Sequence, residues 1–208
     1  MITRKASTTA LILALIAGTT HADTITFNSG EQDLTALGFA IGEGNFAYRS
    51  IAGTLVQTSE QTNPFDPANQ VIVGSASTNG GTLEVVAASV TDPPFLFNSI
   101  DIAQTGFGET DVVVTGRLNG VTVGSDTFTT STNSAEYTTV TANTLSGIQL
   151  DTLWVQLDAQ TGFGGGPIPI RINRLEYVDN LVVTSVPEPT SLALLIPGLA
   201  LIARRKRH

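Results

Sequence analysis

Hydrophobic and polar residues alternate over most of this chain, in short runs separated by clusters of turn-forming residues. A period of two is typical of β-strands with one buried and one solvated face. The clearest pair is 110–118 and 121–128, because Asn119-Gly120 between them favours a two-residue hairpin turn. Residues 31–70 are less regular, and we expect short strands, a turn of helix and loops there. Further strands are predicted at 71–76, 82–88, 95–103, 136–141 and 151–158, and residues 168–183 are expected to form one long, interrupted strand or two strands.

These runs predict an all-β fold, an antiparallel two-sheet sandwich. We favour a jelly roll over an immunoglobulin-like topology, although the pattern does not determine strand order. The chain from Phe95 to Val183 also resembles the galactose-binding-like sandwiches, in the segments 95–103 (FLFNSIDIA), 114–120 (VTGRLNG) and 178–183 (VDNLVV). The resemblance implies the fold more than an activity, because such alternation and Asn-Gly turns recur in many sandwiches.

The N-terminus departs from the strand pattern. Arg4 and Lys5 precede the apolar run 10–18, and Thr20 and Ala22 then supply small residues at positions −3 and −1 of a cleavage site. This is the layout of a signal peptide. We therefore expect residues 1–22 to be a signal peptide that signal peptidase removes between Ala22 and Asp23. The alternative is a short anchor that is never cut.

The C-terminal segment 185–208 combines a motif, an apolar run and a basic end. The apolar run, 191–203, is shorter than the roughly 20 residues that a helix needs to cross the hydrocarbon core, so it suits a transient membrane segment. The basic residues would stay cytoplasmic. The motif consists of Val186, Pro187, Glu188 and Pro189, and the basic end contains Arg204, Arg205, Lys206 and Arg207.

Motif, apolar run and basic end in this order resemble the PEP-CTERM sorting signal of Gram-negative bacteria. The resemblance implies that an exosortase recognises the segment and cuts near the motif. It also implies an inner-membrane intermediate, and then the cell surface or extracellular matrix of a biofilm-forming, exopolysaccharide-producing bacterium. Two alternatives stay open: a tail anchor that is never cut, and an ordinary C-terminal helix. The body between the two ends is then one sandwich domain, 23–184.

The composition of residues 23–189 excludes several chemistries. This part contains no lysine, histidine or cysteine, and its four arginines face eighteen acidic residues, so its formal charge is −14 where the whole chain carries −8. Without histidine or cysteine there is no Ser-His-Asp triad, no cysteine nucleophile and no ordinary zinc site. With so few bases, nucleic acid is a poor partner. Oxygen ligands remain, and they favour calcium.

Three aromatic residues are candidates for binding a sugar ring. Trp154, the only tryptophan, lies in 151–158 on the face opposite Leu153, and its flat ring could stack on a pyranose. The alternative is that it packs under a loop or beside an edge strand. Tyr48 and Phe107 lie in turn-rich surroundings and could line a patch at one end of the sandwich. Their alternative role is to anchor loops in the core.

Two aspartates are candidates for a structural Ca²⁺. Asp101 and Asp179 fall at comparable places near strand ends, and calcium prefers oxygen ligands. The alternative is that they cap turns or are solvated, and neither has EF-hand spacing. No residue is predicted to be catalytic, because eighteen carboxylates single out no glycosidase pair.

The sequence therefore predicts an exported surface or extracellular-matrix protein that is not an enzyme and that binds exopolysaccharide. Exosortase and signal peptidase would be its processing partners. Two other functions remain as alternatives. One is a purely structural surface protein without a specific ligand, and the other is a hydrolase that acts on matrix glycans.

Overall fold

The computed structural model describes residues 21–28, 32–34, 40–57, 71–74, 80–88, 94–106, 109–130, 136–163 and 171–186. The predicted signal peptide up to residue 20 lies outside these residues, as do the sorting motif after Val186, the transmembrane segment 191–203 and the basic end. Within the described residues, no helix is both long and apolar enough to span a membrane.

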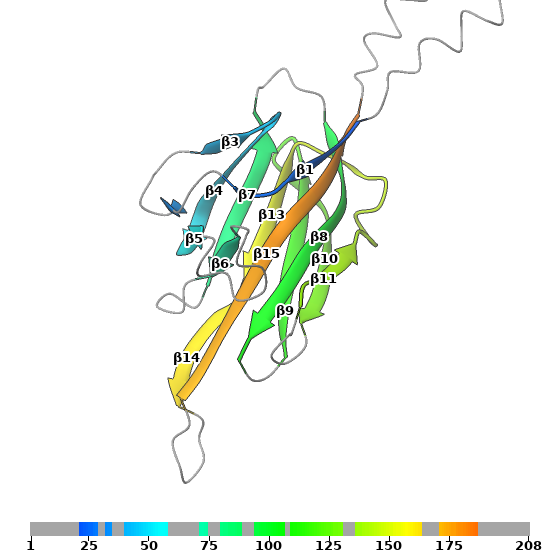
Figure 1. Ribbon diagram of the computed structural model, residues 1–208. Coiled ribbons are helices and arrows are strands. Elements are labelled where there is room, and N and C mark those ends of the chain that lie inside the picture. The colour runs from blue at the N-terminus through cyan, green and yellow to red at the C-terminus, as the bar shows by residue number, and fades with distance from the viewer. Residues whose placement is uncertain are drawn as a thin grey trace, which may run out of the picture.

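Two antiparallel sheets make up the described fold (Figure 1). Sheet A contains β1 (Ala22–Ile25), β2 (Gln32–Asp33), β5 (Leu55–Gln57), β6 (Ile72–Gly74), β8 (Phe95–Thr105), β11 (Thr138–Thr141), β12 (Gln149–Leu150), β14 (Ala159–Phe163) and β15 (Arg171–Ser185). Sheet B contains β3 (Ile41–Glu43), β4 (Phe46–Gly53), β7 (Gly81–Ala87), β9 (Thr110–Leu118), β10 (Val121–Thr130) and β13 (Thr152–Leu157). The prediction of an all-β, antiparallel two-sheet sandwich is confirmed.

Strand order shows how the chain passes between the sheets. Sheet A runs β11-β8-β15-β6-β5-β2, with β1 and β14 paired to β15 and β12 paired to β8; sheet B runs β10-β9-β13-β7-β4-β3. From β8 the chain crosses to β9 and β10 in sheet B, returns to β11 and β12, crosses again to β13 and returns to β14 and β15. Repeated crossing of this kind is how jelly rolls connect their sheets.

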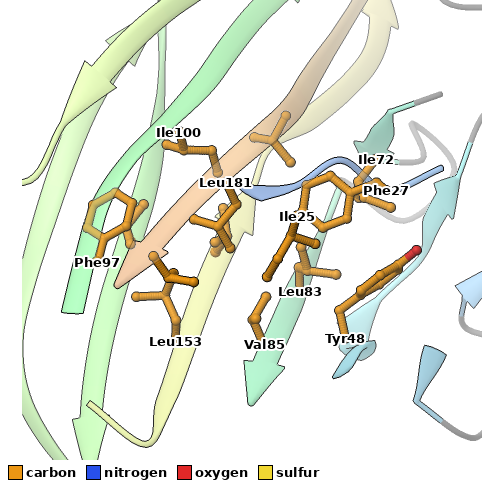
Figure 2. Packing of buried hydrophobic residues seen from close by; sticks show 14 of the residues in the cluster. Ile25, Phe27, Tyr48, Ile72, Leu83, Val85, Phe97, Ile100, Leu153 and Leu181 are labelled. Atoms are coloured by element: carbon orange, nitrogen blue, oxygen red, sulfur yellow. The ribbon is translucent and has the colours of Figure 1, made fainter. Parts of the chain in front are cut away.

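The core fills the space between the inner faces of the two sheets. Figure 2 shows Leu83, Val85 and Leu153 of sheet B facing Phe97 and Leu181 of sheet A, and all five are at most 1% exposed. Alternation explains the arrangement, because every second residue of a strand points to the same side. The chain has no cysteine and so no disulfide. Burial of this apolar layer is therefore what mainly holds the two sheets together.

The β9–β10 hairpin follows the sequence prediction closely. Asn119 and Gly120 both have positive φ, at 53° and 76°, as a type I′ turn requires. Thr122 pairs with Arg117, and a bulge then follows between Thr122 and Gly124. The bulge shifts the register, so that Gly124 pairs with Gly116.

One carboxylate joins the two sheets beside β10. Asp126 is 4% exposed and accepts hydrogen bonds from the backbone N–H groups of Asn143, Thr144 and Leu145, at 2.9, 2.6 and 3.2 Å. These residues belong to the connection between β11 and β12 of sheet A. Because β10 is the edge strand of sheet B, Asp126 fastens one sheet to the other at this side.

The first and last described strands lie side by side. Strand β1 pairs with the end of β15, with Ala22 opposite Thr184 (Figure 1). Beyond that pair, Ser185 N donates to the carbonyl of His21 at 3.2 Å, and Val186 N donates to the carbonyl of Pro94 at 2.8 Å. The chain therefore enters and leaves the sandwich at the same end, next to the start of β8.

Candidate functional site

The candidate site is one row of side chains that crosses the strands on the outer face of sheet B. In register across five strands lie Arg49 of β4, Glu84 of β7, Trp154 of β13, Thr115 of β9 and Ser125 of β10. Each of these residues has at least one buried neighbour along its strand, and in β13 exposure alternates regularly with burial. We call these five residues the Trp154 row.

Two contacts hold the indole ring of Trp154 from different directions. Its Nε1 donates to Glu84 Oε1 at 3.1 Å, and the guanidinium carbon of Arg117 lies 4.0 Å from the ring centroid. A cation at this distance over an aromatic face is attracted by the ring quadrupole. The half-buried ring is therefore fixed in position before any ligand arrives.

The other oxygen of Glu84 belongs to an ion pair. Glu84 Oε2 accepts from Arg49, whose Nε and Nη2 lie 2.7 and 2.6 Å away. The Glu84 side chain is 13% exposed, and the Arg49 side chain is 51% exposed. Glu84 thus serves two partners, and its charge is neutralised within the row.

Arg117 lies beside the row on the same face, two residues along β9 from Thr115. Its Nη2 donates to the carbonyl of Gly120 in the hairpin turn, and its Nε is shielded from solvent with no hydrogen-bond partner. Across the strands it pairs with Thr152 and Thr122. Among the described residues Arg117 takes part in no ion pair.

Hydroxyl and amide groups surround the aromatic ring on this face. Thr115 and Ser125 bond each other through their side-chain oxygens at 3.0 Å. Thr152 and Gln156 precede and follow Trp154 at the spacing that places them on its side of β13. Such groups donate and accept hydrogen bonds, so they match the hydroxyls of a sugar.

The three aromatic residues predicted from the sequence occupy different places. Trp154 lies on the polar face, as its alternation with Leu153 predicted, but in a central strand between β9 and β7 and not beside an edge. Phe107 lies outside the described residues. Of the three, Trp154 is therefore the one that the described residues place in the candidate site.

Tyr48 requires a correction, because it lies in strand β4 and not in a loop at the end of the sandwich. It is 0% exposed, its ring packs edge-on against Phe27 at 5.1 Å, and its hydroxyl donates to Gln57 Oε1 at 3.1 Å. No ligand reaches a side chain in this position. Tyr48 is part of the core, the alternative role considered for it.

The two predicted calcium ligands lie directly opposite each other in β8 and β15. Asp101 accepts from Thr139 Oγ1 and, at 2.9 Å, from Asn180 Nδ2, while Asp179, 1% exposed, accepts from Asn180 N at 2.7 Å. Among the described residues no group of three or more His, Cys, Asp or Glu side chains is placed to hold a metal ion. Calcium at this pair stays a prediction, and the contacts observed belong to a bulged strand with Asn180 at φ 43°.

Fold and row together define a β-sandwich with a tryptophan-bearing polar sheet face. No protein-family model matches the chain, and no curated protein matches it. Among solved structures, a family 29 carbohydrate-binding module from Piromyces equi has a TM-score of 0.43 at 11% identity, covering 81% of this chain and 93% of that chain. A variant of another family 29 module, solved with mannohexaose, has a TM-score of 0.42 at 12% identity, covering 80% and 93%. Similarity at TM-scores below 0.5 assigns neither a family nor a ligand to this chain.

Proposed function

We propose that this protein is an exported, non-catalytic component of the cell surface or extracellular matrix that binds exopolysaccharide through the Trp154 row. The observation that carries the proposal is the fixed, half-buried indole of Trp154 on an otherwise polar sheet face. An aromatic ring offers the apolar side of a sugar a matching surface, while neighbouring polar groups take its hydroxyls.

The rigidity of the row favours binding. Trp154 is held through both its edge and its face, so little side-chain freedom is lost when a sugar stacks on it. The row spans five strands, which are roughly 4.8 Å apart, so it extends over roughly 19 Å. That length suits several units of a polysaccharide rather than a single sugar.

The carboxylate in the row supports a binding role over catalysis. A glycosidase places two carboxyl groups on either side of the bond that it cleaves. Within the Trp154 row the one carboxylate is Glu84, and both of its oxygens already accept hydrogen bonds, from Trp154 and Arg49. We therefore propose that the protein is not an enzyme.

The export route belongs to the same proposal. Signal peptidase and an exosortase would be its processing partners, at Ala22-Asp23 and near the motif that begins at Val186. Ala22 is the first residue of β1, where it pairs with Thr184. The signal peptide would therefore be cut before β1 joins the sheet, since a protease needs the strand free of its partner.

A binding experiment with the processed, exported protein tests the proposed function. Calorimetry against purified exopolysaccharide of the host should show saturable binding. Trp154→Ala should weaken it by roughly tenfold or more, because truncating an aromatic anchor of a binding surface typically costs about 2 kcal/mol or more. Val121→Ala, at the 66% exposed hairpin position, is the matched control and should leave binding unchanged.

Other outcomes separate the alternatives. No binding, with calcium or with chelator, would leave a purely structural surface protein. Release of shorter glycans during incubation, lost when one carboxylate is replaced, would establish a hydrolase.

A further inference from the structure

We infer that the Trp154 row selects an acidic polysaccharide, with Arg117 receiving the carboxylate of a uronic acid. The inference rests on the proposed function and adds to it the chemical class of the ligand. It is carried by the contrast between the two arginines of this face.

Arg49 and Arg117 are in opposite electrostatic situations. Arg49 contacts the Glu84 carboxylate at 2.6 Å, so its charge is compensated within the protein. Arg117 contacts a π-face and a backbone carbonyl, and no carboxylate among the described residues lies within ion-pair distance of it. The face therefore presents one guanidinium within an ion pair and one outside any ion pair of the described residues. The Asp151 carboxylate near Arg117 is bonded to Asn119 N and Thr152 Oγ1.

The position of Arg117 is fixed without an anion. The Trp154 ring lies under its guanidinium at 4.0 Å, and Nη2 is bonded to the Gly120 carbonyl. Its Nε is shielded from water without a partner, so part of the ion's hydration has been removed and not replaced. An anion at the outer nitrogens of this guanidinium would compensate its charge, because a charge that is partly buried and unpaired is costly.

The chemistry of a uronic acid matches this pair of side chains. A guanidinium presents a planar fork of N–H donors that binds a carboxylate through two parallel hydrogen bonds. The indole of Trp154 is stacked against that guanidinium, so an apolar ring and the fork lie within reach of one sugar unit. A uronic acid combines a pyranose ring with a carboxylate at its rim, and Glu84, paired with Arg49, contributes no unbalanced negative charge against it.

The rest of the body is acidic, so a preference for an acidic ligand must come from a short-range contact. With four arginines against eighteen acidic residues, residues 23–189 repel polyanions in general. That repulsion is screened beyond about 8 Å at physiological ionic strength, so only a short-range contact can reverse it. Binding of a uronate would therefore report the contact at Arg117 and not a general attraction.

The test compares oligosaccharides that differ only in their carboxylates. Hexasaccharides of galacturonate, mannuronate and guluronate, each with its carboxyl-reduced counterpart, would be titrated into the processed protein by calorimetry. We expect at least one hexauronate to bind roughly tenfold or more tighter than its reduced form, since hydrogen bonds to charged groups are the strong ones. A hexasaccharide of neutral sugars that carries added sulfate groups should bind no tighter than the same hexasaccharide without them.

Variants of Arg117 assign the preference to one side chain. Arg117→Gln should bind native and reduced hexasaccharides alike, and Arg117→Lys should keep only part of the preference, because it keeps the charge and loses the fork. Unchanged thermal melting would show that both variants fold. Thr122→Val, the position paired with Arg117 on β10, is the matched control and should retain the full preference.

Failure of the inference and failure of the proposed function look different. Equal binding of native and reduced forms, a sulfate preference, or binding of host exopolysaccharide without any hexauronate would overturn the inference and leave the proposed function standing. Absence of binding to the exopolysaccharide as well would overturn both.

Discussion

Trp154 lies on a solvated face because its strand alternates, with Leu153 and Val155 buried on the other side. Local sequence is sufficient to predict that placement. The partners of Trp154 are not local, since Glu84 is 70 positions away in the chain and Arg117 comes from another strand. Register between distant strands is set by the whole sheet, so the sequence indicated Arg117 only as one of four bases in an acidic body.

Replacing Glu84 should reduce stability in two distinguishable steps. Glu84→Gln removes the Arg49 ion pair but keeps an oxygen that can accept from Trp154 Nε1, so the free energy of unfolding should fall by less than about 1 kcal/mol. Glu84→Ala also leaves the Trp154 Nε1–H without its acceptor and should lower the free energy of unfolding by about 1–3 kcal/mol. Urea unfolding followed by circular dichroism measures both values. Equal losses would contradict a stabilising role for the Nε1 bond.

At the scale of elements, the sequence predicts strands well where alternation is uninterrupted. The hairpin of β9 and β10 is predicted almost residue for residue. For 168–183, one long, interrupted strand or two were expected, and β15 is the single long strand of the two alternatives. Short strands such as β5, with three residues, carry too little pattern to be recognised, and β14 was not predicted. Their formation depends on neighbours in sheet A, which no local pattern contains.

The hydrogen bonds that Asp126 of β10 accepts from the β11–β12 connection should make the stability of the fold depend on pH. Burial alone would raise the pKa of Asp126, but hydrogen bonds from Asn143, Leu145 and Thr144 together bring that pKa below its usual value of 3.8. Because the folded-state pKa is the lower one, the contribution of Asp126 is present above about pH 3.8 and is lost as the pH falls through the folded-state pKa. Denaturant unfolding from about pH 7 to about pH 2 should show this loss.

Asp126→Asn isolates that contribution. The variant should lose about 1–3 kcal/mol of unfolding free energy near neutral pH, because a charged acceptor of three N–H bonds becomes neutral. It should also depend less on pH in the acidic range than the parent protein. Asp111→Asn, which changes an exposed strand carboxylate bonded to Thr129, is the matched control. Parallel pH curves for parent and Asp126→Asn would contradict the assignment.

At the scale of the whole molecule, β15 is the strand that connects most of sheet A. It pairs with β8 along its length and also with β1, β6 and β14. Its last residue, Ser185, directly precedes the motif that begins at Val186. A cut near the motif would therefore leave every strand of the sandwich in place.

The mass of the exported protein tests the processing at both ends. We expect it to begin at Asp23 and to end between Pro187 and Pro189, because the paired strands start and stop next to these positions. Intact-mass spectrometry of protein purified from the outside of the host cell gives both ends at once. Retention of Arg204 to His208 would contradict cleavage of the C-terminal segment.

Because β1 begins where β15 ends, the two ends of the body lie side by side, and the strands lead away from them (Figure 1). The Trp154 row runs across the strands of sheet B, from β4 to β10. A glycan bound along the row would therefore lie across these strands and not along them.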